Sequence, residues 1–327
     1  MNFLVIETSR HKFHESDNQS IHYLIIPHYL TKILITGAES FIGTNFRKFS
    51  RFKDTEEVSL IDYQPEEIEF GKYNIVLHLA ALVHQSRKIP ETEYFKVNTD
   101  LCLSIAELSK KAGIRQFVYL STLKVYGEKV NGSELRNEKS ECFPDDFYGK
   151  SKYAAEKGLQ KLANADFKVS IVRTPLVYGE GVKANMISLI KLIDTFSILP
   201  FDKIKNKRNF TFAENLVGFI DKVIEKNISG IFIAMDENAI STTELVNYIS
   251  KYLEKKVIIF KLPQLCLHVG RIFIPDIIDR LYGSSEFENN RTKEELNYRP
   301  NYSTEEGIKR MVSFYLKVKK LKSKVKK

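Results

Sequence analysis

The chain has 327 residues, 43% of them hydrophobic and 28% charged, which is the composition of a globular protein with room for a large core. Its formal net charge is +9, but seven lysines fall within residues 317–327, so the excess belongs to one basic tail and does not indicate nucleic-acid binding. Three dispersed cysteines without metal spacing fit a reducing compartment, and no apolar run or leader indicates membrane insertion or secretion. We therefore expect a cytoplasmic protein with no nucleic-acid partner, no transmembrane segment and no metal.

The two ends of the chain differ from the part between them. Residues 1–30 contain four histidines and one short apolar run without helical or strand periodicity, which favours a poorly ordered extension over a metal site. Residues 317–327 form a basic tail, for which we expect a solvated, frayed end. The alternative for this tail is weak attachment to an acidic membrane surface.

Between residues 32 and 173 the hydrophobic pattern alternates between short apolar strands and amphipathic helices. Predicted strands cover residues 32–37, 57–62, 73–80, 116–121 and 168–173, and predicted helices cover residues 41–49, 92–112 and 148–163. Strands separated by helices imply right-handed parallel βαβ units. The sequence therefore predicts an α/β fold with a Rossmann-type, doubly wound parallel sheet over residues 31–175.

After Pro175 the alternation gives way to a mixed pattern, with predicted helices near residues 185–194, 214–225, 242–252 and 304–316. We interpret residues 176–316 as mainly a smaller C-terminal mixed α/β lobe for the substrate, with some segments that return to the sheet. Such a lobe would close a cleft over the carboxyl edge of the sheet, where open α/β folds bind their ligands.

A glycine-containing turn, GAESFIG, follows the first predicted strand and opens the first predicted helix. Gly37 would permit a tight turn, and Gly43 would let the helix lie close to the sheet. The backbone N–H groups around Ser40, Phe41 and Ile42 would then meet a pyrophosphate at the positive end of the helix dipole. This placement predicts a dinucleotide site, although Ser40 stands where a glycine is usual.

Asp62 closes the second predicted strand, 25 residues after Gly37. A carboxylate at this place would accept hydrogen bonds from the ribose hydroxyls of adenosine and would repel a 2′-phosphate. The three residues that follow carry no cation to offset that repulsion. Asp62 therefore favours NAD over NADP, unless it is only a solvated aspartate at the end of a strand.

Tyr148 and Lys152 lie one turn apart at the start of a predicted helix, and Thr122 closes the strand that begins at residue 116. A phenol with its ordinary pKa of about 10 is a poor base at neutral pH, but a nearby ammonium and a positive nicotinamide favour the phenolate. We therefore expect Tyr148 to act as acid and base, Lys152 to assist it, and Thr122 to hydrogen-bond the substrate oxygen.

The ordered motifs TGAESFIG, HLAA, YLSTLKVYG, YGKSK and RTPLVYGEG resemble those of the extended short-chain dehydrogenase/reductases that act on nucleotide sugars, the NAD-dependent epimerase/dehydratase family. The resemblance covers residues 32–316 and implies NAD as cofactor. It leaves open whether helices 101–111 and 152–162 pair across a homodimer, as they do in relatives. It also implies that the cofactor is lined, beyond the glycine turn, Tyr148 and Lys152, by Leu79, Ala80, Ala81, Asn98 and Pro175.

Within that family, residues 121–125 and 176–185 are most similar to UDP-glucose 4-epimerase-like 4-ketoreductases of UDP-N-acetyl-6-deoxyhexoses. This similarity implies a UDP-linked sugar as substrate. It implies substrate contacts from Lys124, Val177, Tyr178, Asn185 and Arg208.

Three hypotheses for the function follow from the motifs. We favour reduction of a 4-keto sugar, and 4-epimerisation by the same residues is the alternative. A non-catalytic NAD-binding protein is a third class, against which the complete set of Thr122, Tyr148 and Lys152 argues. Dehydration is not expected, because the family's 4,6-dehydratases carry an Asp-Glu pair where this chain has Leu123 and Lys124.

Overall fold

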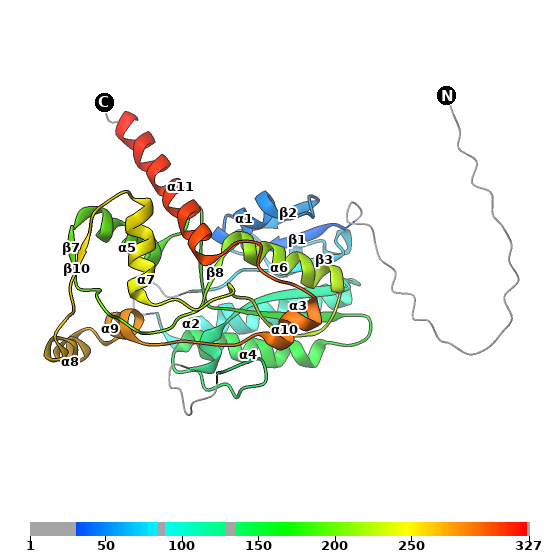
Figure 1. Ribbon diagram of the computed structural model, residues 1–327. Helices are drawn as coiled ribbons and strands as arrows, with labels where there is room; N and C mark the ends of the chain where they lie inside the picture. The colour runs from blue at the N-terminus through cyan, green and yellow to red at the C-terminus, as the bar shows by residue number, and fades with distance from the viewer. Residues whose placement is uncertain (1–30, 84–88, 128–134, 326–327) are drawn as a thin grey trace, which may run out of the picture.

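The computed structural model describes residues 31–83, 89–127 and 135–325 (Figure 1). The extension predicted for residues 1–30 and the last two residues of the basic tail lie outside these ranges. Within the described ranges, no helix combines the length and the apolar character needed to cross a membrane, and no group of histidine, cysteine and acidic side chains is arranged to hold a metal ion.

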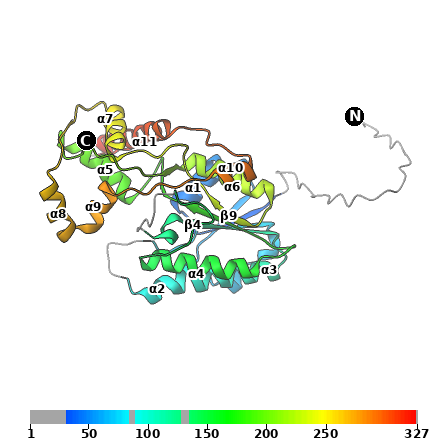
Figure 2. The ribbon, with the colours of Figure 1, turned by 60° about the horizontal axis from the view of Figure 1, so that its bottom comes forward.

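A six-stranded parallel sheet forms the centre of the molecule, with its strands in the order β2-β1-β3-β4-β5-β9 (Figure 2). The strands are β1 (Ile33–Thr36), β2 (Thr55–Val58), β3 (Ile75–His78), β4 (Gln116–Thr122), β5 (Lys168–Thr174) and β9 (Gly230–Ile233). All five pairings between them are parallel. This arrangement confirms the predicted Rossmann-type, doubly wound fold.

Helices cover both faces of this sheet, which is why its inner strands are continuous apolar runs. On one face, α3 (Leu101–Lys111) and α4 (Phe147–Leu162) bury Ile105 and Leu159 against the sheet. On the other face lie α1 (Phe41–Phe49), α6 (Ala213–Lys226) and α10 (Asn290–Leu296), which bury Phe46, Ile220 and Leu296 (Figure 2).

The predicted helix over residues 92–112 is interrupted by a π-helical turn. It consists of α2 (Glu91–Phe95), the turn η4 (Lys96–Asp100) and α3. The turn buries Asn98 and Thr99 in the space between α3 and α4. Turns of this kind occur frequently at functional sites.

The second strand lies earlier in the chain than predicted, at Thr55–Val58 rather than residues 57–62. Thr36 is in register with Val58, whose carbonyl also accepts the N–H groups of Gly37 and Ala38. Beyond this point the chain turns, because the carbonyl of Ser59 accepts the N–H of Asp62. The apolar residues that suggested a longer strand belong to this turn, which is followed by the short 3-10 helices η2 (Pro65–Glu67) and η3 (Phe70–Lys72).

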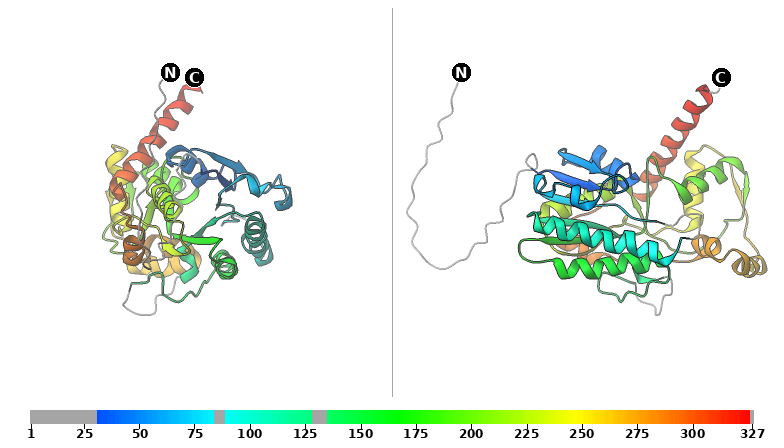
Figure 3. Two further views of the ribbon diagram at one scale, coloured as in Figure 1. Left: turned by 90° about the vertical axis from the view of Figure 1, so that its right-hand side faces the viewer. Right: turned by 180° about the vertical axis from the view of Figure 1, so that it is seen from behind.

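The residues after β5 build a smaller lobe beside the sheet (Figure 1). β6 (Leu176–Tyr178) pairs with β8 (Phe210–Phe212), and β7 (Ile198–Leu199) pairs with β10 (Ile258–Ile259). Around them α5 (Ala184–Thr195), α7 (Thr242–Tyr252) and the start of α11 (Thr304–Val325) share one apolar core. α8 (Gln264–Phe273) and α9 (Pro275–Tyr282) extend from the outer edge of this lobe (Figure 3). The elements α6, β9 and α10 return from this part of the chain to the sheet.

The last helix continues through most of the basic tail, so the expectation of a frayed end from residue 317 is wrong. α11 runs to Val325, because residues 317–325 contain no glycine or proline and lysine favours the helical state. Lysines also interact favourably with the C-terminal end of the helix dipole. Asp194 on α5 fixes the start of this extension, since its Oδ2 accepts from the Nζ of Lys319 and the hydroxyl of Tyr315, each over 2.6 Å.

Candidate active site

Gly37, Ala80, Thr122 and Pro175 follow or close β1, β3, β4 and β5, and the carboxyl ends of these strands meet at one edge of the parallel sheet. The chain passes from β1 to β2 on one side and then returns to β3 on the other. The loops after β1 and β3 therefore diverge at a topological switch point, where open α/β sheets bind ligands.

The turn after β1 brings the chain into close contact with the end of β3. Gly37 has a φ of 98°, which a residue with a side chain rarely adopts. A Cβ atom at Gly37 would lie 2.9 Å from the backbone nitrogen of Ala80 and 3.0 Å from its Cα. Glycine is therefore required here, and it brings Ala80 next to the turn, as the HLAA motif implies.

Ser40 acts as the N-cap of α1, a role that the sequence analysis did not assign to it. Its hydroxyl accepts the N–H of Gly43 over 3.0 Å, and its carbonyl accepts the N–H of Thr44 over 2.9 Å. The N–H groups of Phe41 and Ile42, which precede them, have no intrahelical acceptor. They and the helix dipole are what the turn offers to a pyrophosphate.

Gly43 lets α1 approach β2 closely. A Cβ atom at this position would lie 2.9 Å from Oε1 of Glu57 and 2.8 Å from the hydroxyl of Ser40. The close approach and the exposed helix terminus both fit a dinucleotide. NAD(H) held here would supply the hydride of an oxidoreduction.

Asp62 does not end the second strand, contrary to the prediction. β2 ends at Val58, and Asp62 lies exposed in the turn that Ser59 begins. The turn follows the strand next to β1, so Asp62 remains on the side of the sheet where an adenosine would lie. Its contact with the ribose stays a prediction.

Asn98 connects the loop after β3 to α4. Its amide accepts the N–H of Leu82 over 2.7 Å and donates to the carbonyl of Leu82 over 3.0 Å. It also donates to the hydroxyl of Ser151 over 3.0 Å. The side chain thereby fixes Ala80 and Ala81, which precede Leu82, relative to the helix that carries Tyr148 and Lys152. This is a positioning role.

Thr122 is the last residue of β4, and Lys124, two residues later, contacts the residue that caps α4. The Thr122 hydroxyl accepts the N–H of Lys124 over 3.2 Å, so its own proton is available to a substrate oxygen. The Lys124 ammonium forms an ion pair with Asp146, and Asp146 caps α4 by accepting the N–H of Gly149 over 2.6 Å. These contacts hold the start of α4 against the end of β4.

Tyr148 and Lys152 follow this cap, one turn apart on α4. Burial, followed by the negative charge of Asp146, raises the pKa of the Tyr148 phenol. Burial also lowers the pKa of the Lys152 ammonium to about 8. Without a further positive charge the phenol stays protonated at neutral pH, which suits a group that donates a proton to a reduced carbonyl.

A buried ion pair supports the strand that carries Thr122, and the sequence analysis missed it. Arg173 on β5 donates to Glu156 on α4 over 2.5 Å and 3.1 Å, and both side chains are at most 2% exposed. Ser121 donates to the same carboxylate over 2.5 Å. Glu156 lies one helical turn after Lys152, and this spacing is the only feature of the local sequence that indicates an inward-facing carboxylate.

The residues expected to contact substrate are dispersed around the smaller lobe. Val177 is partly buried against the main core, and Pro175 precedes β6. Asn185 is exposed in the first turn of α5. Arg208 donates to the carbonyls of Gly283, over 2.9 Å, and Asp279, over 3.2 Å.

Tyr178 does not offer its side chain to a ligand. The ring is fully buried, and its hydroxyl donates to Asp236 over 2.8 Å and to the carbonyl of Thr304 over 3.1 Å. Tyr178 is thus a core residue that joins β6 to α11, and only its backbone could face a substrate.

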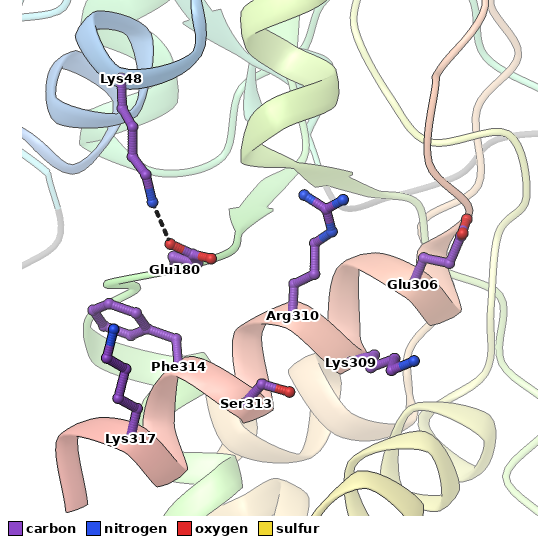
Figure 4. A pocket seen from close by; sticks show the side chains of 8 residues that line it. All are labelled: Lys48, Glu180, Glu306, Lys309, Arg310, Ser313, Phe314 and Lys317. Atoms are coloured by element: carbon purple, nitrogen blue, oxygen red, sulfur yellow. Dashed lines mark hydrogen bonds and ion pairs between the residues drawn. The ribbon is translucent and has the colours of Figure 1, made fainter.

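A separate cavity of about 580 Å³ lies between the end of α1, the loop at Glu180 and α11 (Figure 4). Its lining combines cations with carboxylates. Lys48 pairs with Glu180 over 2.6 Å, and Arg310 is held by Glu214 over 2.8 Å. Because the lining contains none of the predicted catalytic residues, this cavity is distinct from the candidate site at the sheet edge.

Comparison with known proteins gives consistent relatives. A model of the NAD dependent epimerase/dehydratase family matches residues 33–234. A protein of Vibrio cholerae named UDP-glucose 4-epimerase is 32% identical in an alignment of 313 residues that covers 87% of this chain and 95% of that protein. The N-acetyl-alpha-D-glucosaminyl-diphospho-ditrans,octacis-undecaprenol 4-epimerase of Escherichia coli O157:H7 is 23% identical over 71% of this chain and 75% of its own length.

Solved structures show the same fold. UDP-glucose 4-epimerase of Thermotoga maritima superposes with a TM-score of 0.70 at 21% identity, over 88% of this chain and 99% of its own. A dTDP-4-dehydrorhamnose reductase of Clostridium acetobutylicum also gives 0.70, at 20% identity, over 88% of this chain and 100% of its own. These similarities, together with the match of the family model over more than half of the chain, confirm the resemblance of the motifs. The chain therefore belongs to the NAD dependent epimerase/dehydratase family, and it is an NAD-dependent enzyme of nucleotide-sugar conversion.

Proposed function

We propose that this enzyme reduces the C4 carbonyl of a UDP-linked 4-keto sugar, such as a UDP-N-acetyl-6-deoxyhexose, with NADH. The observation that carries the proposal is the contact between the end of β4 and the start of α4. Lys124, two residues after Thr122, pairs with Asp146, two residues before Tyr148, and Lys152 lies one turn further on, which supports a joint role for the three residues.

The residues divide the chemistry as follows. Thr122 donates a hydrogen bond to the substrate oxygen, keeps its proton, and so orients the carbonyl. Tyr148 gives its phenolic proton to the oxygen as negative charge develops there, and Lys152 stabilises the phenolate that remains. The product, a nucleotide sugar with a hydroxyl group at C4, is released, and the phenol regains a proton from solvent.

The residues around Lys124 are the basis for proposing net reduction rather than epimerisation. An epimerase must let its keto intermediate turn between two faces, whereas a reductase needs only one. Lys124 is a long side chain where well-known 4-epimerases carry small ones, and its ion pair with Asp146 holds it in place beside Thr122. This supports a site that presents a single face of the sugar.

Binding of the UDP moiety is proposed for Asn185 and Arg208, with the backbone of Val177 and Tyr178 beside the sugar. Asn185 opens α5, and Arg208 precedes β8, so both belong to the smaller lobe. The lobe would thereby hold the diphosphate while the sheet edge holds the reacting carbon.

The second candidate is a UDP-sugar 4-epimerase, and the similarity to the Vibrio cholerae protein of that name favours it. Such an enzyme would oxidise C4 and reduce it again with the same three residues, and it would retain its cofactor through both steps. Retention of the cofactor is therefore the property that separates the two functions.

The experiment compares two incubations of the purified protein. In the first, UDP-4-keto-6-deoxy-N-acetylglucosamine is added with NADH, and absorbance at the NADH band is followed; we expect one NADH oxidised per sugar reduced. In the second, UDP-N-acetylglucosamine is added alone, and we expect no product. Formation of UDP-N-acetylgalactosamine by protein that already contains NAD would replace the reductase with the epimerase.

A further inference from the structure

One end of the molecule carries an unusual concentration of exposed apolar side chains. Among the described residues, nine of the large apolar side chains that are exposed come from residues 196–198 and 258–274 alone. They lie on β7, β10 and α8 and in the segments beside them. Ile198 and Ile258, for example, are 62% and 66% exposed on paired strands.

The largest part of this surface is the outer side of α8. Leu265, Val269 and Ile272 follow the spacing of one helical stripe, and Leu265 and Ile272 are each 75% exposed. Phe273, next to Ile272, is 77% exposed. A helix in a water-soluble fold normally turns such a stripe to the core, yet none of the residues of α8 is buried. The helix packs on α9, where a Cβ at Gly270 would come 3.0 Å from Ile278.

Positive charge surrounds this apolar surface. Lys256, Lys261 and Arg271 are exposed on or beside β10 and α8. The end of α11 adds a row of exposed lysines and an exposed Leu321. Two of the carboxylates nearby are engaged by cations, because Asp194 pairs with Lys319 and Asp279 lies 3.7 Å from Arg271.

These elements share one end of the fold. Figure 1 places α8, β7, β10 and the tip of α11 at the end opposite to the side from which the chain enters β1, with α8 at the lower corner of that end and the tip of α11 at the upper corner. The first half of α11 is fixed in the core of the smaller lobe, so its second half projects beyond the body of the molecule (Figure 1). We name this surface, formed by α8, β7, β10 and residues 317–325, the basic apolar face.

We propose that the basic apolar face docks the enzyme on the surface of an anionic membrane. Protruding aliphatic and aromatic side chains can enter the boundary between headgroups and acyl chains, while the lysines meet lipid phosphates. A bilayer offers acyl chains and phosphates over a wide area. It can therefore contact α8, the strands β7 and β10 and the end of α11 at the same time. It also accounts for the apolar stripe of α8, which is stable in water only at a cost.

Other occupants fit this combination less well. A nucleic acid would use the lysines but would gain little from Leu265, Ile272 and Phe273. A second copy docked through the same face would bring two sets of lysines together, because a twofold interface joins identical patches. Charge complementarity therefore favours the anionic lipid.

The test measures binding of the full chain to vesicles by cosedimentation. Vesicles of phosphatidylcholine alone are compared with vesicles of phosphatidylcholine and phosphatidylglycerol in equal parts. We expect binding to the anionic vesicles to be at least ~10-fold tighter, and to weaken as salt is raised.

Two variants separate the apolar and the basic contributions. Ile272→Ser with Phe273→Ser should weaken binding to anionic vesicles by about 10-fold, since both side chains enter the bilayer. Lys320→Glu, Lys322→Glu and Lys324→Glu together should weaken it by more than ~10-fold. All five positions are exposed, and thermal unfolding of each variant verifies that the fold is retained.

Matched controls carry the same chemical changes elsewhere. Leu135→Ser with Phe143→Ser removes two exposed apolar side chains, and Lys111→Glu, Lys139→Glu and Lys226→Glu alter the net charge equally. We expect each control to bind within about twofold of the wild type.

The proposal is overturned if the wild type binds neither vesicle or both equally, or if the controls lose as much binding as the variants. Dimers that form without lipid and dissociate in the Ile272→Ser, Phe273→Ser variant would assign the face to a second copy instead. Tight binding to duplex DNA that only the lysine variant abolishes would assign it to a nucleic acid. None of these results depends on which reaction the active site performs.

Discussion

The ammonium nitrogen of Lys152 lies 4.0 Å from the centre of the Tyr119 ring, beneath α4 and within the fold. The ring face attracts the cation, but burial is the larger effect and lowers the pKa of Lys152 to about 8. Lys152 is thus held in place at a cost to the stability of the fold.

We predict that Lys152→Met raises the melting temperature at pH 7 while abolishing turnover. At that pH the folded and unfolded chains both carry the lysine proton, and the folded chain bears the full cost of burying it, on the order of 3 kcal/mol. Calorimetry should show a rise of about 5 °C. Lys150→Met, an exposed neighbour on the same helix, should leave the melting temperature nearly unchanged.

The sign of the pH dependence follows from the same pKa. Between about pH 8 and the ordinary lysine value of 10.5, the unfolded chain binds a proton that the folded chain has released. The contribution of Lys152 to the free energy of unfolding of the wild type therefore becomes more favourable as the pH rises across that window. The advantage of Lys152→Met over the wild type should shrink from pH 8 to pH 10, and an advantage that grows would contradict the assignment.

Tyr148→Phe should abolish turnover and leave NADH binding intact. The phenol is needed to transfer a proton and contributes little to holding the cofactor, and positioned acid–base groups are worth about 10²–10⁴-fold in rate. Fluorescence titration with NADH and a steady-state assay measure the two properties separately. A variant that retained more than about a tenth of the activity would exclude Tyr148 as the proton donor.

Asp62→Ala should narrow a preference for NADH over NADPH. The carboxylate of Asp62 would repel a 2′-phosphate, and its loss removes that repulsion while also removing an acceptor for the ribose hydroxyls. Titration of both cofactors measures the ratio of dissociation constants. If the wild type already prefers NADPH, Asp62 does not accept hydrogen bonds from the adenosine ribose.

Glu156→Ala should destabilise the protein strongly, by about 3–5 kcal/mol, because it leaves the buried Arg173 guanidinium unpaired. Chemical denaturation measures the loss. Removal of Glu295, whose pair with Arg291 is exposed, should cost no more than about 1 kcal/mol. Equal losses in the two variants would mean that burial does not decide the contribution of Glu156.

Local patterns predicted those parts of the fold and site in which neighbours in sequence act together. The turn at Gly37 and the pair Tyr148 and Lys152 each lie within a few residues of one element, so their spacing alone is informative. The error at β2 has a local cause too, because this edge strand contains Glu56 and Glu57, while the turn after it contains Leu60 and Ile61.

Features made by distant segments could not be predicted in this way. Tyr178 stands in a motif that suggested a ligand contact, but Asp236 and Thr304, far along the chain, draw its hydroxyl into the core. The ion pair of Glu156 and Arg173 likewise joins two elements, α4 and β5, and forms only once the helix has packed against the strand. Strands of two or three residues, such as β7 and β10, form only because their partners are present.

The late return of α6 and β9 to the sheet affects how the chain must fold during synthesis. The apolar face formed by Ile33, Ile35 and Leu77 is covered only in part, by α1, until Leu216 and Ile220 have left the ribosome. Contacts between residues so far apart in sequence close slowly, because a long loop must be ordered first. During this interval the nascent Rossmann segment exposes apolar surface. A translation pause after β5 should therefore increase its dependence on chaperones and its tendency to aggregate.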